Sequence, residues 1–580
     1  MVSIVIPVWN QVDYTVACLE SIANCTPEPH EIIVVDNGST DGTKLFLAEY
    51  VRLKRNMTVI ENERNLGFPV ACNQGIAFSK GEHILLLNND VVVSPEWLKG
   101  MIECMAAQPD YGIVGPRTNS ISGPQQFTDG KYSNPEEFTE FAQGFRKTFR
   151  NYRIPFWRIV GFCMLIKREV IEKIGTFDER FSPGNFEDDD FCLRSILAGY
   201  RNVICGDVFV HHHGSASHRS IDHGKLLEKN QEKFIAKWKG WQAEHSTISC
   251  CMIVKNEEKN IGNCLTHIVP LVDEVVVVDT GSTDRTKEIA ATFPKVKLYD
   301  FPWVNDFSKA RNFANQQATG DWIFSLDADE VIESLDRGQL FPGHAIAFET
   351  RNYTNSATWK GWRANTGESP LEEGIGWFPS IKIRLFPNDK RIFWQYPVHE
   401  VLEPSVYDLG LMRVKSEQPI HHTGKVCQDI DIEKGKAYYA YLQQAVEANP
   451  DDVRHVDELA TQAQNLSEYD KALELWQHYL SLDLKQDEKF NGWLNLGHCL
   501  ASLGRNQEAL EASRMAWKFN PDSREAAMNT GVLLFRLGFY ESALKIARTL
   551  NNLYPEYPLP VGLYKDCVRA MEMDYVCGGI

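Results

Sequence analysis

Long apolar runs are missing from this sequence of 580 residues. No stretch reaches the roughly eighteen consecutive apolar residues that a transmembrane helix needs, so we expect no transmembrane segment. The chain starts with the strand-like residues 2–7, which leaves no room for a signal peptide, and we expect a cytoplasmic protein. Its 14 cysteines include no Cys-x-x-Cys pair, which predicts reduced and mostly buried thiols.

Basic residues are too few to balance the acidic ones. The chain has 60 Lys and Arg against 78 Asp and Glu, and its formal net charge is -18. Such a charge disfavours binding along a nucleic-acid backbone or on an anionic membrane, so we expect neither as a partner. The length exceeds what one hydrophobic core holds and predicts about three or four domains.

One stretch of the sequence occurs twice. Residues 31–43 read EIIVVDNGSTDGT, and residues 274–286 read EVVVVDTGSTDRT. Each copy is a run of β-branched residues that ends in an Asp, followed by small and hydroxyl residues that leave a strand and open a helix. A carboxylate and backbone N–H groups at the carboxyl end of a parallel strand suit a base and ribose. The repeat therefore predicts two nucleotide sites, at Asp36 and at Asp279.

Further echoes follow in the same order. Residues 81–90 and 320–330 are apolar strands that stop at polar residues, and a His-x-Gly sequence occurs at His212 and again at His422. Strands that alternate with helices predict a doubly wound, mostly parallel sheet in each copy, an α/β fold. Residues 116–158 are rich in Gly, Pro, aromatic and basic residues and predict a loop beside the substrate site.

The last part of the chain is helical in composition and repeats every 34 residues, since Gly497, Ala509 and Pro521 recur as Gly531, Ala543 and Pro555. This is the tetratricopeptide (TPR) spacing, in which small residues let paired helices pack closely. We therefore divide the chain into two α/β domains, residues 1–240 and 241–428, and an all-α repeat solenoid, residues 429–580. The concave face of the solenoid would hold a protein acceptor or a second copy of the chain.

Acidic residues at the abrupt end of a buried strand cost free energy unless a cation or hydrogen-bond donors neutralise them. Asp327 and Asp329 occupy such a place and predict a clamp for Mn²⁺ or Mg²⁺, which can bridge the phosphates of a nucleotide diphosphate. In the first copy Asn88 and Asn89 carry no charge, so Asp90 is the main predicted ligand there. Helix capping or loop solvation is the alternative interpretation.

Three consecutive histidines, residues 211–213, end the first copy. Adjacent strand residues point to opposite faces, so the three cannot all bind one ion. We expect one imidazole to complete an oxygen-rich metal shell and choose His212, because His422 holds the same His-x-Gly position. A histidine with ordinary hydrogen bonds is the alternative.

Crowded carboxylates at residues 187–190 can raise the pKa of one of them, which then serves as general base for an acceptor hydroxyl. We choose Asp188, with Glu187 beside it. In the alternative interpretation, Glu187 and Asp190 cap the helix and pair with Arg194.

The second copy lacks these consecutive acids, and its candidates are Glu372, Glu373 and Glu400. We prefer Glu400, which ends the sequence YPVHE, although a structural salt bridge explains it equally well. Arg311 and Asn312 lie between the nucleotide strand and the metal clamp, where Arg311 would offset diphosphate charge.

At these motifs the chain resembles a known family. VIPVWN, VVDNGSTDGT, NLGF, NND and EDDDFCLR are similar to inverting family 2 glycosyltransferases with the GT-A fold, especially a rhamnosyltransferase-like branch. MIVKNEE, VVDTGSTDRT, DFSKARN and DADE are similar to a second branch, often joined to TPR repeats, that includes peptide-modifying enzymes of the sublancin glycosyltransferase kind.

The resemblance implies two nucleotide-sugar sites, DXD-type metal sites and a base at Asp188. The nucleotide-sugar residues expected in the first copy are Pro7, Asp36, Gly38, Ser39, Asn65, Gly67, Asn73, Asn88 and Asn89. Those expected in the second copy are Asp279, Gly281, Ser282, Asp284, Arg311, Asn312, Asp327 and Ala328. The expected metal ligands are Asp90, His212, Asp327, Asp329 and His422.

We therefore predict a bifunctional, inverting, metal-dependent enzyme. It would transfer sugars from UDP- or dTDP-sugar donors to a glycan, protein or peptide acceptor in successive steps, and it could form a homodimer through the TPR region. An alternative is that one GT-A domain is inactive and the repeats act as a scaffold. A nucleotidyltransferase would need a Gly-rich basic loop after the first strand, which the sequence PVWN does not supply.

Overall fold

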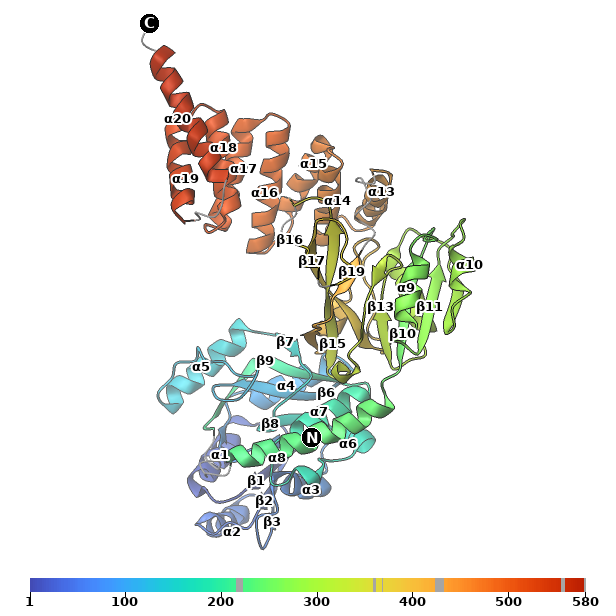
Figure 1. Ribbon diagram of the computed structural model, residues 1–580. Coiled ribbons are helices and arrows are strands. Elements are labelled where there is room, and N and C mark those ends of the chain that lie inside the picture. The colour runs from blue at the N-terminus through green and yellow to red at the C-terminus, as the bar shows by residue number, and fades with distance from the viewer. Residues whose placement is uncertain (215–222, 358–360, 368, 423–431, 554–558, 578–580) are drawn as a thin grey trace. The chain divides into compact units, whose positions relative to one another are not determined.

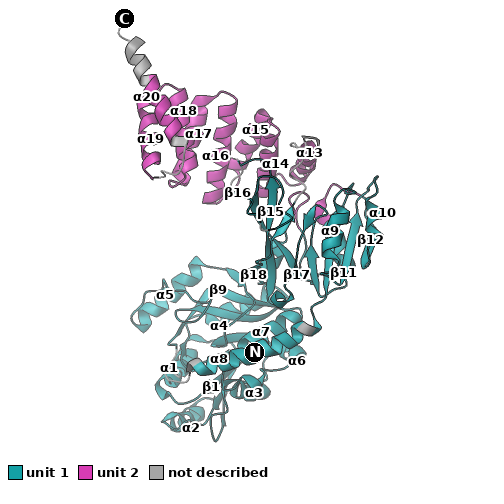
Figure 2. Ribbon diagram, in the orientation of Figure 1, with its two compact units in different colours: residues 1–302, 310–394, 401–426 teal, residues 303–309, 395–400, 427–580 magenta. Residues whose placement is uncertain are grey.

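The computed structural model describes residues 1–214, 223–357, 361–367, 369–422, 432–553 and 559–577. The chain forms two compact units (Figure 2). The first comprises residues 1–302, 310–394 and 401–426, and the second comprises residues 303–309, 395–400 and 427–580. Among the described residues, no helix has both the length and the apolar composition that crossing a bilayer requires.

The first sheet has the strand order β3-β2-β1-β4-β8-β6-β9-β5, with β7 beside β9 (Figure 1). Its strands are β1 (Val2–Val8), β2 (His30–Asp36), β3 (Met57–Glu61), β4 (His83–Leu87), β5 (Val91–Val92), β6 (Tyr111–Thr118), β7 (Arg153–Pro155), β8 (Cys163–Lys167) and β9 (Arg201–His212). Strands β1 to β4 pair in parallel. Strand β8 runs antiparallel between β4 and β6, and β5 and β7 run antiparallel to β9, so the sheet is mixed. The other six of its nine strands share one direction, which agrees with the prediction of a mostly parallel sheet.

Helices cover both faces of this sheet. Its helices are α1 (Val12–Cys25), α2 (Thr43–Leu53), α3 (Phe68–Phe78), α4 (Trp97–Ala106), α5 (Pro135–Thr148), α6 (Arg168–Ile174) and α7 (Glu187–Leu197). Ile4 and Ile6 of β1 pack with α1 and α4, whereas Val5 packs with α3 and α7. This alternation is what a strand buried on both faces produces, and it confirms the α/β prediction.

The second sheet repeats the first in its strand order, β12-β11-β10-β13-β17-β15-β19-β14. Its strands are β10 (Ile248–Val254), β11 (Glu274–Asp279), β12 (Val296–Asp300), β13 (Trp322–Ser325), β14 (Glu330–Val331), β15 (His344–Thr354), β16 (Arg363–Ala364), β17 (Gly376–Pro387), β18 (Met412–Lys415) and β19 (Ile420–His422). Strand β17 takes the place of β8 and is again antiparallel to its two neighbours. Its helices are α9 (Ile261–Ile268), α10 (Thr286–Ala290), α11 (Phe307–Gln317) and α12 (Glu403–Asp408).

The stretch predicted as a loop, residues 116–158, contains helix α5 and strand β7. The side chain of Asn134 caps α5 by accepting a backbone N–H three residues later. Phe138 and Phe145 of this helix pack against Phe209 of β9. The loop prediction is therefore wrong for α5 and β7, because the helical spacing of the aromatic residues was given less weight than the composition.

Helices α13 to α20 make up most of the second unit, and consecutive helices pack on each other (Figure 1). They are α13 (Ile432–Ala448), α14 (Val453–Asn465), α15 (Tyr469–Ser481), α16 (Gln486–Ser502), α17 (Asn506–Phe519), α18 (Arg524–Arg536), α19 (Tyr540–Leu553) and α20 (Leu559–Cys577). A Cβ at Gly497 would lie 3.1 Å from Ser513 Oγ, so small residues do mark close helix crossings. The TPR assignment stays a prediction, and Pro555 and the boundary at residue 429 lie outside the described residues.

Candidate active sites at two sheet edges

Each copy of the repeated sequence buries the carboxylate that ends its strand. Asp36 Oδ1 accepts the N–H of Ser39 at 3.0 Å, and Asp279 Oδ2 accepts the N–H groups of Gly281 and Ser282 at 3.0 and 2.9 Å. The other oxygen of each carboxylate is buried and has no hydrogen-bond partner within the described parts of the chain. An unsatisfied buried acceptor costs about 1–3 kcal/mol, so both sites can gain from a ligand that donates a hydrogen bond.

The loops around these carboxylates repeat the same hydrogen bonds. The N–H of Asn10 donates to Ser39 Oγ at 2.8 Å, and the N–H of Asn256 donates to Ser282 Oγ at 2.9 Å. Both asparagines have a φ of 57°, a left-handed conformation that asparagine tolerates better than most residues. The serines predicted for nucleotide-sugar binding therefore also fix the loop geometry.

Two glycines and one acid complete the loops. Gly38 has a φ of 79° and Gly281 a φ of 106°, which favour glycine at both positions. A Cβ at Gly38 would lie 2.6 Å from the backbone of Arg64, whereas a Cβ at Gly281 would have no atom within 4 Å. Asp284 accepts N–H groups from Thr286 and Glu258, so its carboxylate closes the loop.

Other predicted nucleotide-sugar residues hold the backbone. Asn65 Oδ1 accepts the N–H of Gly67 at 2.8 Å, and Pro7 is buried within β1. The amide of Asn73 bridges the backbone N–H and C=O of Phe177 at 3.0 and 2.9 Å. Contact with a donor remains a prediction for these residues.

The amide of Asn312 bridges Trp394 in the same way as Asn73 bridges Phe177, at 2.8 and 2.9 Å. Asn89 donates to Thr15 Oγ1 at 3.0 Å, and Ala328 is buried. Helices α3 and α11 thus hold matching places in the two sheets, each fixed by one asparagine.

Strand pairing brings an acid and a histidine together in both sheets. The β5–β9 pair leaves Asp90 Oδ1 3.3 Å from His212 Nε2, and the β14–β19 pair leaves Asp329 Oδ2 3.0 Å from His422 Nε2. His212 Nδ1 lies 2.7 Å from the carbonyl of Ser120, an acceptor, so Nδ1 carries a proton.

The second imidazole is held in the same manner. His422 Nδ1 lies 2.9 Å from Asn352 Oδ1, while the Asn352 amide nitrogen donates to carbonyl oxygens such as that of Phe378. In a neutral imidazole held this way, the Nε2 lone pair faces a carboxylate, an arrangement that requires a proton or a metal ion between them. Burial by itself lowers the pKa of His212, but the hydrogen bond and charge of Asp90 raise it above its ordinary value.

These acid–histidine pairs fit a divalent ion. Two adjacent ligands, each about 2.1 Å from an ion, lie about 3.0 Å apart, close to the O···N separations seen here. Within the described residues, no three acidic, histidine or cysteine side chains gather into one metal-binding group. Mg²⁺ is commonly held by one or two carboxylates together with water and substrate phosphates, and a two-residue site leaves room for such ligands.

The first acid of the second clamp has other partners. Arg311 Nη2 lies 2.8 Å from Asp327 Oδ1, and Arg384 Nη1 lies 3.8 Å from Asp327 Oδ2. Burial alone raises the pKa of Asp327, but these two guanidinium groups together hold it well below its usual range. The charge of these arginines already neutralises Asp327. Metal binding by Asp327 stays a prediction.

The first sheet has neutral residues in both of these places. Cys72 precedes the bridging Asn73 as Arg311 precedes Asn312, and Asn88 follows β4 where Asp327 follows β13. The Cys18 thiol of α1 donates to the carbonyl of Asn88 at 3.7 Å. The Cys264 thiol of α9 donates to the carbonyl of Asp327 at 3.5 Å. The second sheet therefore has both the acid and the arginine, and the first sheet has neither. The sequence patterns did not reveal this pairing.

The predicted base of the first sheet lies at the start of α7. Asp188 Oδ2 accepts the N–H of Gly161 at 2.9 Å, and its Oδ1 accepts the N–H of Asp189 at 3.0 Å. The ring of Phe162, next to Gly161, stacks on His212 with centroids 5.0 Å apart. The adjacent residues Gly161 and Phe162 therefore connect Asp188 to His212 of the acid–histidine pair.

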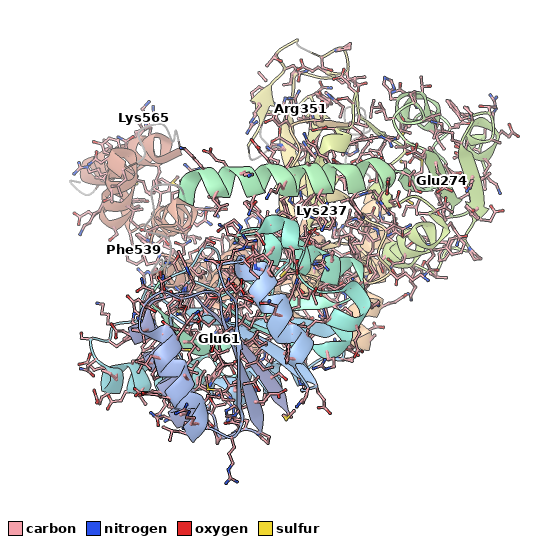
Figure 3. All side chains as sticks on the ribbon, turned by 90° about the horizontal axis from the view of Figure 1, so that it is seen from below. Glu61, Lys237, Glu274, Arg351, Phe539 and Lys565 are labelled. Atoms are coloured by element: carbon pink, nitrogen blue, oxygen red, sulfur yellow. The ribbon has the colours of Figure 1, made fainter. Side chains whose placement is uncertain are left out.

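The acids beside Asp188 are also buried. Burial raises the pKa of Glu187 well above its ordinary value and that of Asp189 to about 8, and the charge of Asp188 adds to both shifts. Asp190 pairs with Arg194 at 2.9 Å, as the alternative interpretation proposed, and with Lys237 at 2.5 Å. Figure 3 shows Lys237 on the long helix α8 (His223–Glu244).

The raised pKa of Asp189 predicts a stability that depends on pH. Its value in the folded chain, about 8, exceeds the ordinary 3.8, so its contribution to stability is full below about pH 4 and is lost as the pH rises through 8. We expect Asp189→Asn to flatten the loss of stability between pH 6 and 9 in urea unfolding. The exposed Glu169→Gln is the control, and equal slopes for Asp189→Asn and the unchanged chain would contradict this prediction.

The candidate acids of the second copy are the adjacent Glu372 and Glu373 and the more distant Glu400. Glu372 accepts the N–H of Gly367 at 2.7 Å and the hydroxyl of Thr366 at 3.1 Å, within an exposed loop. Burial raises the pKa of Glu373. Glu400 belongs to the second unit. The base of the second copy stays a prediction.

Two stretches of the chain match the model of a known family. The model of Glycosyl transferase family 2 matches residues 3–175 and 249–340. A TPR repeat-containing protein of Synechococcus elongatus is 39% identical over 29% of this chain and 38% of its own length. The glycosyltransferase SunS of Bacillus subtilis is 38% identical over 17% of this chain and 24% of its own. A chondroitin synthase of Escherichia coli is 23% identical over 57% and 54%. The chain thus spans less than two thirds of each relative.

Proposed function

We propose that this chain is a family 2 glycosyltransferase with one sugar-transfer site at each sheet edge, and that the two sites extend one acceptor in turn. The observation that carries the proposal is the repetition of one arrangement. Each edge has a buried carboxylate with an unused oxygen, at Asp36 and Asp279, and an acid–histidine pair. We assign both domains, residues 1–240 and 241–428, to the inverting GT-A type, with donors of the UDP- or dTDP-sugar class.

The residues of each edge have distinct roles in this proposal. Asp36 and Asp279 accept hydrogen bonds from the nucleoside of the donor. Asp90 with His212, and Asp329 with His422, would hold Mn²⁺ or Mg²⁺, whose charge would stabilise a diphosphate leaving group. Asp188 takes the proton of the acceptor hydroxyl as that oxygen attacks the anomeric carbon from the face opposite the leaving group, and Glu400 does so in the second site.

The relatives support an acceptor that is a polymer. One is named as a chondroitin synthase and another as a TPR repeat-containing protein. We propose that the helices of residues 429–580 form the TPR-type surface that holds a glycan, protein or peptide acceptor, or a second copy of the chain. The alternative proposal is that one of the two sites is inactive and the repeats act as a scaffold.

A donor panel tests the function. UDP- and dTDP-sugars with Mn²⁺ are incubated with the chain and with Asp90→Ala and Asp329→Ala, and diphosphate release and product masses are measured. We expect each variant to lose one of two activities and EDTA to remove both. Asp300→Ala is the control, because Asp300 is exposed at the end of β12 and has no role in the proposal. We expect it to keep both activities. Loss of both activities in either variant, or no turnover by any chain, would contradict two independent sites.

A further inference from the structure

One basic residue, Arg158, lies in the loop that joins β7 to β8. Asn202 of β9 donates to the carbonyl of Trp157 at 2.9 Å, and the N–H of Ile159 donates to the Sγ of Cys192 of α7 at 3.2 Å. The thiol of Cys192 donates in turn to the carbonyl of Ile159 at 3.5 Å. Side chains from two other elements therefore fix the backbone on both sides of Arg158.

The guanidinium of Arg158 faces the buried acids at the start of α7. Its Nε lies 2.9 Å from Asp189 Oδ1 in an ion pair. Burial alone lowers the pKa of Arg158, but the charges of Asp188 and of the acids beside it outweigh burial and raise this pKa. Arg158 is therefore a fixed positive charge beside Glu187, Asp188 and Asp189.

Two backbone hydrogen bonds connect this ion pair to Asp188. The N–H of Asp189 donates to Asp188 Oδ1 at 3.0 Å. The N–H of Gly161, three residues after Arg158, donates to Asp188 Oδ2 at 2.9 Å. The start of α7 and the loop of Arg158 thus hold both the carboxylate and the cation, which fixes the place of one relative to the other.

Two other cations near these acids have a different partner. Arg194 lies 2.9 Å from Asp190 Oδ2, and Lys237 lies 2.5 Å from Asp190 Oδ1. Those two cations therefore neutralise Asp190, whereas Arg158 serves the three acids that precede it.

Two buried thiols lie close to the same acids. Burial raises the pKa of Cys72 on α3 and of Cys192 on α7 above the ordinary value, which favours the uncharged thiol. Burial, the largest cause, also raises the pKa of Glu187 and Asp189, which favours their protonated forms. The single positive charge of Arg158 therefore matches a single carboxylate in this cluster.

We propose that Arg158 is a positioning residue of the first transfer site, whose charge keeps one carboxylate of this cluster ionised so that Asp188 can act as the base. The inference rests on the proposed role of Asp188. In that step the acceptor proton passes to Asp188, the acceptor oxygen bonds to the anomeric carbon, and the diphosphate leaves with the electron pair of its bond to that carbon. Without Arg158, the crowded and buried carboxyls would bind a further proton. The second copy lacks the consecutive acids, so a change at Arg158 acts on the first site alone.

The pH dependence of kcat in an Asp329→Ala background, where only the first site works, tests the proposal. The probes are the UDP- and dTDP-sugars of the panel with Mn²⁺. We expect Arg158→Gln to move the rising limb of the kcat profile to higher pH by about one unit or more, which lowers kcat on that limb about tenfold or more. The rate should recover as the pH rises, with the donor KM changed less than twofold. Arg158→Lys should move the limb less, and Arg52→Ala, exposed on α2, should leave it in place.

A double change separates this role from a purely structural one. Arg158→Gln with Asp189→Asn removes both partners of the ion pair, so neither partner is left buried alone and the chain should fold. We expect its limb to lie at higher pH than that of Asp189→Asn alone, because Asp188 still lacks its cation. Identical profiles for these two chains, or a fall in the kcat of Arg158→Gln that is equal at every pH, would overturn the positioning role.

Infrared spectroscopy of the carboxyl C=O stretch gives a readout that needs no turnover. Near neutral pH, Arg158→Gln should show one more protonated carboxyl than the unchanged chain, and the same change in an Asp188→Asn background should show no such gain. No gain in Arg158→Gln, or an equal gain in both backgrounds, would refute the role of the Arg158 charge. A fully active Asp188→Asn would instead refute the proposed base, and the infrared result would still decide whether Arg158 keeps a carboxylate ionised.

Discussion

Replacing Arg311 by alanine should destabilise the second sheet by about 3 kcal/mol, whereas the double change Arg311→Cys with Asp327→Asn should cost much less. The single change removes one partner of a buried pair whose N···O distance is 2.8 Å, and the carboxylate loses the nearer of its two neutralising charges. Complete burial would predict 3–5 kcal/mol; because a third of the Asp327 side chain is exposed, we expect the lower end of this range.

The double change copies the first sheet, where Cys72 and Asn88 occupy the matching places without charge. Removing both charges leaves no unpaired ion, although the contact of Arg311 with the ring of Trp394 at 5.0 Å is also lost. Native-state hydrogen exchange of the β13 amides measures the opening free energy in each chain. Equal losses for the single and the double change would show that the two residues do not act as a pair.

The same pair shows what the sequence could predict and what it could not. The ends of the strands were predictable, because β-branched runs that stop at polar residues have few other interpretations. The repeated sequence also predicted that Asp36 and Asp279 hold equivalent places, and their matching hydrogen bonds agree with this. An acid at a strand end looks the same in sequence whether a metal or an arginine neutralises it, so the Arg311–Asp327 pair was missed.

Long-range pairing set a second limit. The antiparallel place of β8 between β4 and β6 depends on contacts with residues far away in the sequence. Local periodicity carries no information on strand direction, so the reversed direction of β8 could not be predicted from it. The bridging role of Asn73 and Asn312 was hidden for the same reason, since each amide binds a backbone far along the chain.

Asp188→Asn should abolish transfer by the first site, with a fall in kcat of about 10³-fold, and leave the second site intact. An amide of the same shape can still accept the N–H of Gly161, but it cannot take a proton from an acceptor hydroxyl. The change should preserve donor binding, because the acceptor and not the donor meets this group. The measurement is product formation in an Asp329→Ala background, with the donor Kd determined separately.

Glu187→Gln is the matched control within the same cluster. Burial and the charge of Asp188 raise the pKa of Glu187 well above its ordinary value, which favours the protonated carboxyl, and an amide resembles that form closely. We therefore expect Glu187→Gln to keep most of the first-site kcat. A loss as large as that of Asp188→Asn would mean that the two carboxyls share one proton or that Glu187 is the base, and an active Asp188→Asn would remove Asp188 from the reaction.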